Sequence, residues 1–440
     1  MDRFLPHSAG FLGFETAHAG LKRVLVLFVG GWDHIAYTHA RHHARYAFHF
    51  EGFDLFSFPG NARLLTFNLL HFAERMAAKY RGRIDAVVSN NEQFGALAAS
   101  LIAKKLGLPG LSPLPLLLAQ HKFYMRERLA EHIPEAMPRY CTFPYTFNSR
   151  EEIALEFPFF VKPVKAAYSV LARRVENYDE LRQHLDFHPW EKYIIKRLVR
   201  PFNDACRALT DFSIDAHHLV GESLLQGEQI NIDGLVFDGQ IHILGIVDAV
   251  MYPGTLAFMR WDYPSRLPSL WQERAAVVAR KAIAALDYDH GFFNVEMTVD
   301  RQSGDIKIIE INPRMASQFS DMYAKVDGID LHDIGIDMAL GHIPNIEKKT
   351  MPCSCAASFV LRKFTLENLP CEPAHDRVEW LKRFDPDAIL TTFIKQGGQL
   401  KREMKWLGSY RYAVLNMGAE NEAALMEKFG IVRSKLGFCG

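Results

Sequence analysis

The stretch Gly291–Arg314, GFFNVEMTVDRQSGDIKIIEINPR, determines the fold that we expect. Both of its halves alternate apolar and polar residues, which is typical of paired β-strands. Ser303-Gly304 lies where the chain must turn between the two strands. A turn centred there places Glu296 of the first strand opposite Glu310 of the second.

Glu310 and Asn312 are two residues apart, so they share one face of the second strand, while Ile309 and Ile311 are expected on the other. Two carboxylates directly across a sheet repel each other. A divalent cation between them reverses that effect, and Glu296, Glu310 and Asn312 offer the oxygen ligands that suit Mg²⁺. The alternative is an exposed hairpin edge with solvated acids. The apolar neighbours of Glu310 argue against that alternative.

The first third of the chain alternates strand and helix patterns. Residues 22–30 and 84–89 have the nearly continuous apolar content of strands in a parallel sheet. Residues 64–80 and 94–106 have helical patterns. Residues 106–120 are apolar and free of charge but contain three prolines, so we expect a loop there rather than a helix or a membrane span. The alternation predicts an opening α/β unit.

The remaining chain continues with mixed elements, including successive strands over 219–250. We therefore expect a mixed α/β (α+β) protein with three parts. These are an N-terminal α/β domain at 1–119, a central domain at 120–345 and a C-terminal α/β lobe at 346–440.

The composition excludes several functions. The 440 residues carry 51 Lys+Arg and 51 Asp+Glu, a balance that argues against binding nucleic-acid phosphates or anionic membranes. The N-terminus lacks the pattern of a secretory signal. The six cysteines are scattered without a CxxC pair, which favours reduced thiols and a cytoplasmic location.

The run IIEINPR at 308–314, preceded by the acid in NVEM, resembles the metal-binding end of ATP-grasp ligases. That family includes carboxylate–amine ligases and the carbamoyl-phosphate synthase large subunit. The resemblance extends from about Gln120 to Gly341, and implies an ATP-grasp fold with a pre-ATP-grasp lobe, a central lobe and a lid at about 158–230. Relative to the usual pattern of that family, residues 198–218 look like an insertion in the lid, of unknown role. It also implies that the acids and Asn312 bind one or two Mg²⁺, with Mn²⁺ as a substitute.

The resemblance assigns residues that contact ATP. Lys122 and Lys162 match the cations that reach the phosphates, and a compact ammonium suits that role. Glu222 and the backbone of Leu224 match the hinge that meets adenine. The lid loop reads KPVKAAYS at 162–169, so it keeps Ser169 but lacks the family's glycines. Lys165 is the residue that we expect to replace the lost backbone contacts.

Three further assignments remain open between alternatives. The ribose hydroxyls fall to Gln229 or to Glu228 beside it. Arg314 matches the arginine that stabilises the transferred phosphoryl group or the substrate carboxylate. Arg260 is either a second arginine for the carboxylate or a surface residue packed on an aromatic neighbour.

The resemblance implies an enzyme of the carboxylate–amine ligase class. ATP would phosphorylate a small-molecule carboxylate, and an amine would displace phosphate. The opening lobes of the family often pair, which raises a homodimer as one arrangement. A nucleotide-binding pseudoenzyme is the alternative that the glycine-poor loop suggests, and a bicarbonate-activating carboxylase is a third.

Histidines cluster between His34 and His49, and His39, His42 and His43 have the i, i+3, i+4 spacing of one helical face. A metal site is one interpretation of that spacing. Because arginines lie close by, a solvated or substrate-facing helix is the interpretation that we favour.

Overall fold

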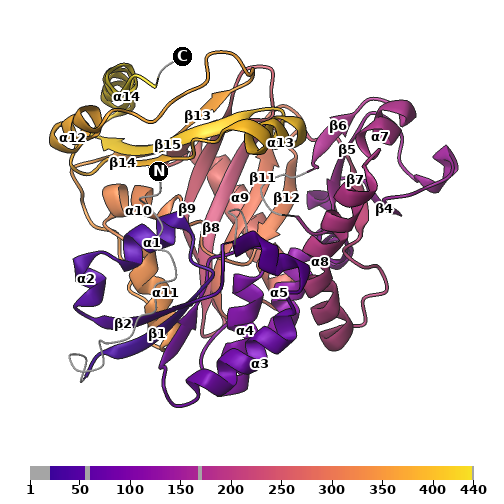
Figure 1. The fold of residues 1–440 in the computed structure, drawn as a ribbon, viewed down its shortest axis with the longest axis horizontal. Coiled ribbons are helices and arrows are strands. Elements are labelled where there is room, and N and C mark those ends of the chain that lie inside the picture. The colour runs from indigo at the N-terminus through magenta and orange to yellow at the C-terminus, as the bar shows by residue number, and fades with distance from the viewer. Residues whose placement is uncertain (1–19, 55–59, 167–170, 439–440) are drawn as a thin grey trace.

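The structure is a computed structural model that describes residues 20–54, 60–166 and 171–438. Its strands form three sheets, and Figure 1 shows the longest of them in the middle of the molecule. The N-terminal sheet has the order β2-β1-β3, and both pairings are parallel. Its strands are β1 (Lys22–Leu27), β2 (Tyr46–Glu51) and β3 (Ala86–Val88). The N-terminal segment is thus the α/β unit that its alternation predicts.

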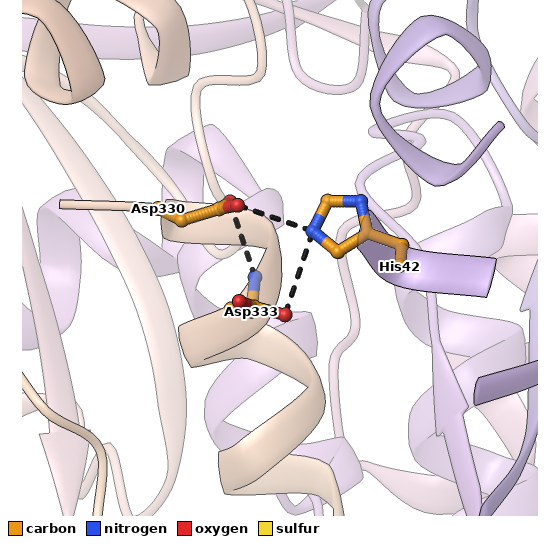
Figure 2. A group of neighbouring side chains, drawn as sticks. All are labelled: His42, Asp330 and Asp333. Atoms are coloured by element: carbon orange, nitrogen blue, oxygen red, sulfur yellow. Dashed lines mark hydrogen bonds and ion pairs between the residues drawn. The ribbon is translucent and has the colours of Figure 1, made fainter. Parts of the chain in front are cut away.

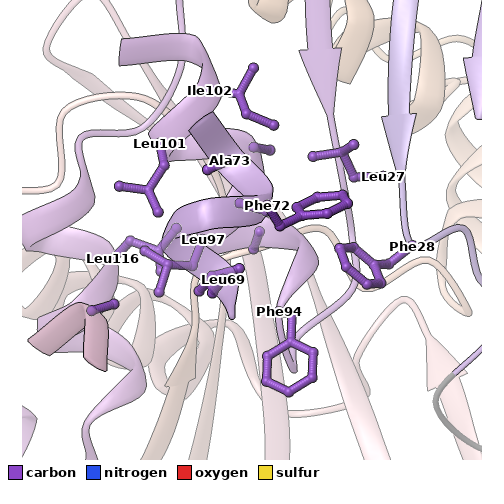
Figure 3. Close-up of a cluster of buried hydrophobic side chains, with 14 of the residues drawn as sticks. Leu27, Phe28, Leu69, Phe72, Ala73, Phe94, Leu97, Leu101, Ile102 and Leu116 are labelled. Atoms are coloured by element: carbon purple, nitrogen blue, oxygen red, sulfur yellow. The ribbon is translucent and has the colours of Figure 1, made fainter. Parts of the chain in front are cut away.

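The helices of this segment are α1 (Gly31–Tyr37), α2 (Ala40–His43), α3 (Leu69–Tyr80) and α4 (Gly95–Leu106), with a 3-10 turn at Gly60–Leu65. The expected helix over 64–80 therefore begins only at Leu69, where the side chain of Asn68 accepts a hydrogen bond from the backbone N–H of His71. Apolar side chains of α3 and α4 pack against β1 in a buried cluster (Figure 3).

The expectation of a loop over residues 106–120 is wrong in part, because α5 (Pro113–Gln120) is a helix. Pro113 and Pro115 lie in its first turn. Backbone N–H groups there have no partner within the helix, so proline removes no hydrogen bond. The prolines therefore mark where this helix begins.

The central sheet has eight strands in the order β12-β11-β8-β9-β10-β13-β15-β14. All its pairings are antiparallel. Its strands are β8 (Glu228–Phe237), β9 (Gln240–Met251), β10 (Phe258–Tyr263), β11 (Gly291–Val299), β12 (Ile306–Asn312), β13 (Cys355–Lys363), β14 (Ile389–Thr392) and β15 (Tyr410–Ala419). One sheet thus continues across the expected boundary at residue 345.

Helices cover both faces of this sheet. α9 (Ser269–Ala285) contacts β9 and β11 across a core of Ile, Val and Ala side chains. α10 (Ser320–Asp327) and α11 (Leu331–Ala339) lie against the other face. The C-terminal helices are α12 (His375–Phe384), α13 (Gly397–Leu407) and α14 (Glu422–Leu436).

The third sheet has the order β4-β7-β5-β6 and forms the part of the chain expected to be the lid. Its strands are β4 (Tyr140–Pro144), β5 (Phe159–Pro163), β6 (Arg173–Val175) and β7 (His218–Ser223). The helices nearby in sequence are α6 (Lys122–His132), α7 (Tyr178–His184) and α8 (Pro189–Leu209), with 3-10 turns at Pro134–Ala136 and Arg150–Glu152. The sheet therefore begins at β4, before the expected lid boundary at 158.

The insertion at 198–218 belongs largely to α8, which contacts α3. Its buried face, including Val199, Phe202 and Ala205, joins the same apolar core as the N-terminal segment. This core ties the lid sheet to the N-terminal sheet. Among the described residues, the structure has no helix with the length and apolar content needed to cross a membrane.

We expect Phe202→Ala to lower the free energy of unfolding by about 3 kcal/mol, because it removes a buried ring from this shared core. Leu209→Ala at the exposed end of the same helix is the matched control and should cost well under about 1 kcal/mol. Urea denaturation of both variants measures the difference. Equal losses would contradict the shared core.

Candidate active site

The hairpin of β11 and β12 has the register that the sequence predicts. Glu296 pairs with Glu310, and Asn294 pairs with Asn312. Directly paired residues point to the same side of a sheet, and residues two apart in a strand do so as well. Four oxygen-bearing side chains therefore share one small area of the sheet.

A β-bulge interrupts this hairpin at Ile309, the residue without a partner in the register. Ile311 lies in the apolar core as expected, but the expectation for Ile309 is wrong, because Ile308 occupies the core in its place. The bulge turns the carbonyl of Ile309 toward two cations. It accepts hydrogen bonds from Lys162 Nζ at 2.9 Å and Arg126 Nη2 at 2.6 Å.

Opposite effects act on the two facing carboxyl groups. Burial and the charge of Glu310 raise the pKa of Glu296 to about 7. Burial also favours a raised pKa for Glu310, but Lys122, Lys162 and Arg314 lower it to about 2. Lys122 Nζ lies 3.2 Å from Glu310 Oε2. Glu310 is therefore ionised at neutral pH, whereas Glu296 needs a further positive charge nearby to be fully ionised.

Strand β8 extends this polar face. Gln229 Nε2 donates to Glu296 Oε2 at 3.2 Å, and Asn231 Nδ2 donates to Asn294 Oδ1 at 3.2 Å. Asp233 accepts a hydrogen bond from Asn294 at 2.8 Å, and its burial raises its pKa to about 6. Sequence reasoning missed Asn231 and Asp233. The alternation in Ile230–Asp233, INID, was the signal that could have found them.

Lys162 on β5 is held by a buried carboxylate. Its Nζ lies 2.9 Å from Glu222 Oε2, and Arg126 Nε lies 2.9 Å from Glu222 Oε1. Burial lowers the pKa of Lys162, while Glu222 opposes that effect. Burial would raise the pKa of Glu222, but Arg126 and Lys162 lower it. The Glu222 side chain therefore positions a lysine, and sequence reasoning missed Arg126.

Glu92, in the loop after β3, joins two more cations. Its Oε2 lies 3.1 Å from Arg314 Nε, and its Oε1 lies 3.1 Å from Lys165 Nζ. Gln120 Nε2 also donates to Glu92 Oε1 at 3.0 Å. Sequence reasoning missed Glu92. Its place after a parallel strand was the available signal, because such strand ends often carry ligand-binding residues.

The remaining expected ATP contacts differ in placement. Leu224 is half-buried in the segment between β7 and β8. Gln229 reaches Glu296, whereas exposed Glu228 pairs with Arg301 at 2.7 Å. The geometry thus favours Gln229 over Glu228 as the residue on the site. Ser169 lies outside the described residues.

The structure does not bring Arg260 to this cluster. The register aligns Trp261 with Ala249 and, through β9, with Gln229 on the polar face. Arg260 therefore points to the opposite face. Its Nε donates to Asp262 at 2.9 Å. The expected contact with a substrate carboxylate does not fit this position.

The donor set fits a hard divalent cation. Glu296, Glu310 and Asn312 supply oxygens from adjacent strands, and Asn312 Nδ2 already donates to Glu296 Oε1 at 3.3 Å. Asn231 Oδ1 is buried close to this group without a hydrogen-bond partner. Two facing, half-buried carboxylates and an unsatisfied oxygen are the arrangement that Mg²⁺ or Mn²⁺ stabilises.

Part of the chain matches a known family of proteins. Residues 155–321 match the family model described as ATP-grasp domain. Residues of the chain are 34% identical over 101 positions to the carbamoyl phosphate synthase large chain of Pseudothermotoga lettingae, a match that spans 21% of this chain and only 9% of that protein. The chain therefore contains an ATP-grasp domain.

Solved structures show the same fold over nearly the whole chain. The L-amino acid ligase of Bacillus licheniformis has a TM-score of 0.69 at 16% identity, covering 94% of this chain and 97% of its own. An Aspergillus clavatus N5-carboxyaminoimidazole synthase, solved in complex with ADP and 5-aminoimidazole ribonucleotide, has a TM-score of 0.64 at 15% identity. The match covers 94% of this chain and 99% of that one. At these identities the likeness concerns the fold alone.

The ion pairs of Glu222 predict a dependence of stability on pH. Its folded pKa lies below the ordinary value of 4.5, so its stabilising effect is complete above about pH 4.5 and is lost as the pH falls. At pH 7, Glu222→Gln should lower the free energy of unfolding by about 3 kcal/mol, because two buried cations lose their partner. The difference in unfolding free energy between wild type and Glu222→Gln should become smaller below about pH 4.5.

Denaturant titrations at pH 7 and pH 3.5 measure that difference. Glu228→Gln, an exposed neighbour in sequence, is the control and should change stability little at either pH. A difference for Glu222→Gln that stays constant with pH would contradict the assignment of an ionised, paired Glu222.

Proposed function

We propose that the chain is an ATP-dependent ligase that converts a small-molecule carboxylate into an acyl phosphate and joins the acyl group to an amine. The observation that carries this proposal is the facing pair of Glu296 and Glu310, with Asn312 beside them and lysines at its edge. Two facing carboxylates destabilise the fold by themselves, but together they can bind a cation that in turn binds a polyphosphate.

The chain's cations bind the phosphates in this proposal. Lys122 and Lys162 contact the phosphates from beside the pair Glu296 and Glu310. Lys165, in the loop after β5, contacts them as a third cation. Mg²⁺ held by Glu296, Glu310 and Asn312 would neutralise charge on the β- and γ-phosphates. The salt bridge from Glu222 and the Ile309 carbonyl keep Lys162 in place.

The nucleotide's other end lies near the start of β8. The backbone around Leu224 meets the adenine, and Gln229 contacts the ribose or the metal-bound phosphates. Glu222 acts indirectly, because its carboxylate is occupied by Arg126 and Lys162.

Two displacements then join the substrates. An oxygen of the carboxylate attacks the γ-phosphorus, ADP leaves, and Arg314 stabilises charge on the transferring phosphoryl group. The amine, as its neutral form, attacks the acyl carbon, phosphate leaves, and the amine loses one proton. Arg314 is held for this role by Glu92 at 3.1 Å.

Amino acids are the first substrates to test, because the Bacillus licheniformis relative of the same fold is an L-amino acid ligase. A screen of phosphate release over amino acids and small dicarboxylates with Mg·ATP identifies an active pair. Tight ATP binding without ADP formation on any substrate would instead support a nucleotide-binding regulator. Bicarbonate belongs in the same screen as the carboxylase alternative.

With an active pair in hand, Glu310→Gln should lower the rate of substrate-dependent ADP release by at least about 100-fold, because it removes a metal ligand and the partner of Lys122. Glu228→Gln is the control, since this residue pairs with Arg301 outside the cluster. Unchanged ADP release in Glu310→Gln would overturn the proposed site.

A further inference from the structure

A second cluster of ligand-type side chains joins α2 to the start of α11. It contains His42, Asp330 and Asp333, and their potential ligand atoms all lie within 4.8 Å of one another (Figure 2). His42 is fully buried, so the expectation that its helical face is solvated is wrong for this residue. His39 and His43 on either side of it are exposed.

The ring of His42 is oriented by the backbone. Its Nδ1 lies 2.6 Å from the carbonyl oxygen of Ala36, which can only accept, so Nδ1 carries a proton. In the neutral ring Nε2 then has a lone pair. That lone pair faces two carboxylate oxygens, Asp330 Oδ2 at 3.1 Å and Asp333 Oδ1 at 3.4 Å. Arg41 Nη2 lies 2.6 Å from the same Asp330 Oδ2 and neutralises part of its charge, but it leaves the Nε2 lone pair and Asp333 Oδ1 facing each other without a positive charge between them.

A proton or a metal ion can supply that charge. A proton on Nε2 makes one good hydrogen bond, to Asp330, and leaves Asp333 Oδ1 buried without a hydrogen-bond partner. A metal ion satisfies all three atoms at once. With metal–ligand distances of about 2.0–2.2 Å, tetrahedral ligands lie about 3.3 Å apart, close to the two separations from Nε2.

The surroundings resemble those of a bound metal. Metal-binding histidines usually donate their second N–H to a carbonyl or carboxylate, as His42 does. Arg45 binds Asp333 through the other oxygen, Oδ2, at 2.6 Å, and the backbone N–H of Asp333 donates to Asp330 Oδ1. These contacts hold the carboxylates in place and leave Asp333 Oδ1 directed at His42.

The local charge leaves room for a cation. Asp330, Asp333 and Asp337 face Arg41 and Arg45, which leaves one net negative charge around a neutral His42. We propose that His42, Asp330 and Asp333 bind a divalent cation of the zinc class, separate from the Mg²⁺ site. One imidazole and two carboxylate ligands suit Zn²⁺, and an open fourth position takes water. The ion would fasten α2 to α11.

Zinc binding to the full-length, EDTA-stripped chain tests this proposal. Equilibrium dialysis in excess Mg²⁺, which occupies the acidic hairpin, is followed by metal analysis of wild type, His42→Ala, Asp333→Asn and His43→Ala. Wild type and His43→Ala should bind one more equivalent than His42→Ala. Asp333→Asn should bind at least tenfold more weakly. His43→Ala is the matched control for adventitious binding at an exposed histidine.

Two further readouts keep the test independent of folding defects. Zinc should raise the melting temperature of wild type and of His43→Ala but not that of His42→Ala, since only a ligand of the native state stabilises it. Bound Co²⁺ in wild type should show the visible absorption of a tetrahedral site. Equal zinc binding by wild type and His42→Ala, or no binding by folded wild type, would overturn the proposal and leave a proton as the occupant.

Discussion

The repulsion between Glu296 and Glu310 is the constraint around which the site is arranged. Partial burial makes this repulsion stronger, because less water screens the two charges than at the open surface. Three positive groups at the edge of the pair offset the repulsion: Lys122 at the start of α6, Lys162 on β5 and Arg314 after β12. These groups come from separate segments, so the local charge balance depends on the correct packing of all of them.

Two other carboxylates, Glu222 and Glu92, keep the cations around the site in position. Glu222 joins Lys162 to Arg126, and Glu92 joins Lys165 to Arg314. An unpaired buried lysine loses its charge easily, because burial lowers its pKa. By pairing with Lys162 and Lys165, the carboxylates of Glu222 and Glu92 favour the charged form of each lysine, which is the form that binds a phosphate. The contacts of Glu92 also link the N-terminal sheet to the loop after β5.

The sequence predicted the hairpin well, because alternation and one turn determine a local register. It did not predict the bulge at Ile309, whose carbonyl accepts hydrogen bonds from Lys162 and Arg126, two residues far away in the sequence. Glu92 and Asp233 escaped notice because their partners lie far away in the sequence. The sequence predicted no strand around Arg260, and the face on which this residue lies follows only from the pairing of β9 with β10.

The continuity of the central sheet has a consequence for dividing this chain. Strand β10 pairs with β9 on one side and with β13 on the other, across the domain boundary expected at residue 345. A fragment ending there would leave the backbone N–H and C=O groups of β10 unpaired along an open edge, which invites association with other chains. The part of the chain before residue 345 and the C-terminal ninety residues therefore share one sheet, and any recombination with segments of other proteins must preserve the pairing of β10 with β13.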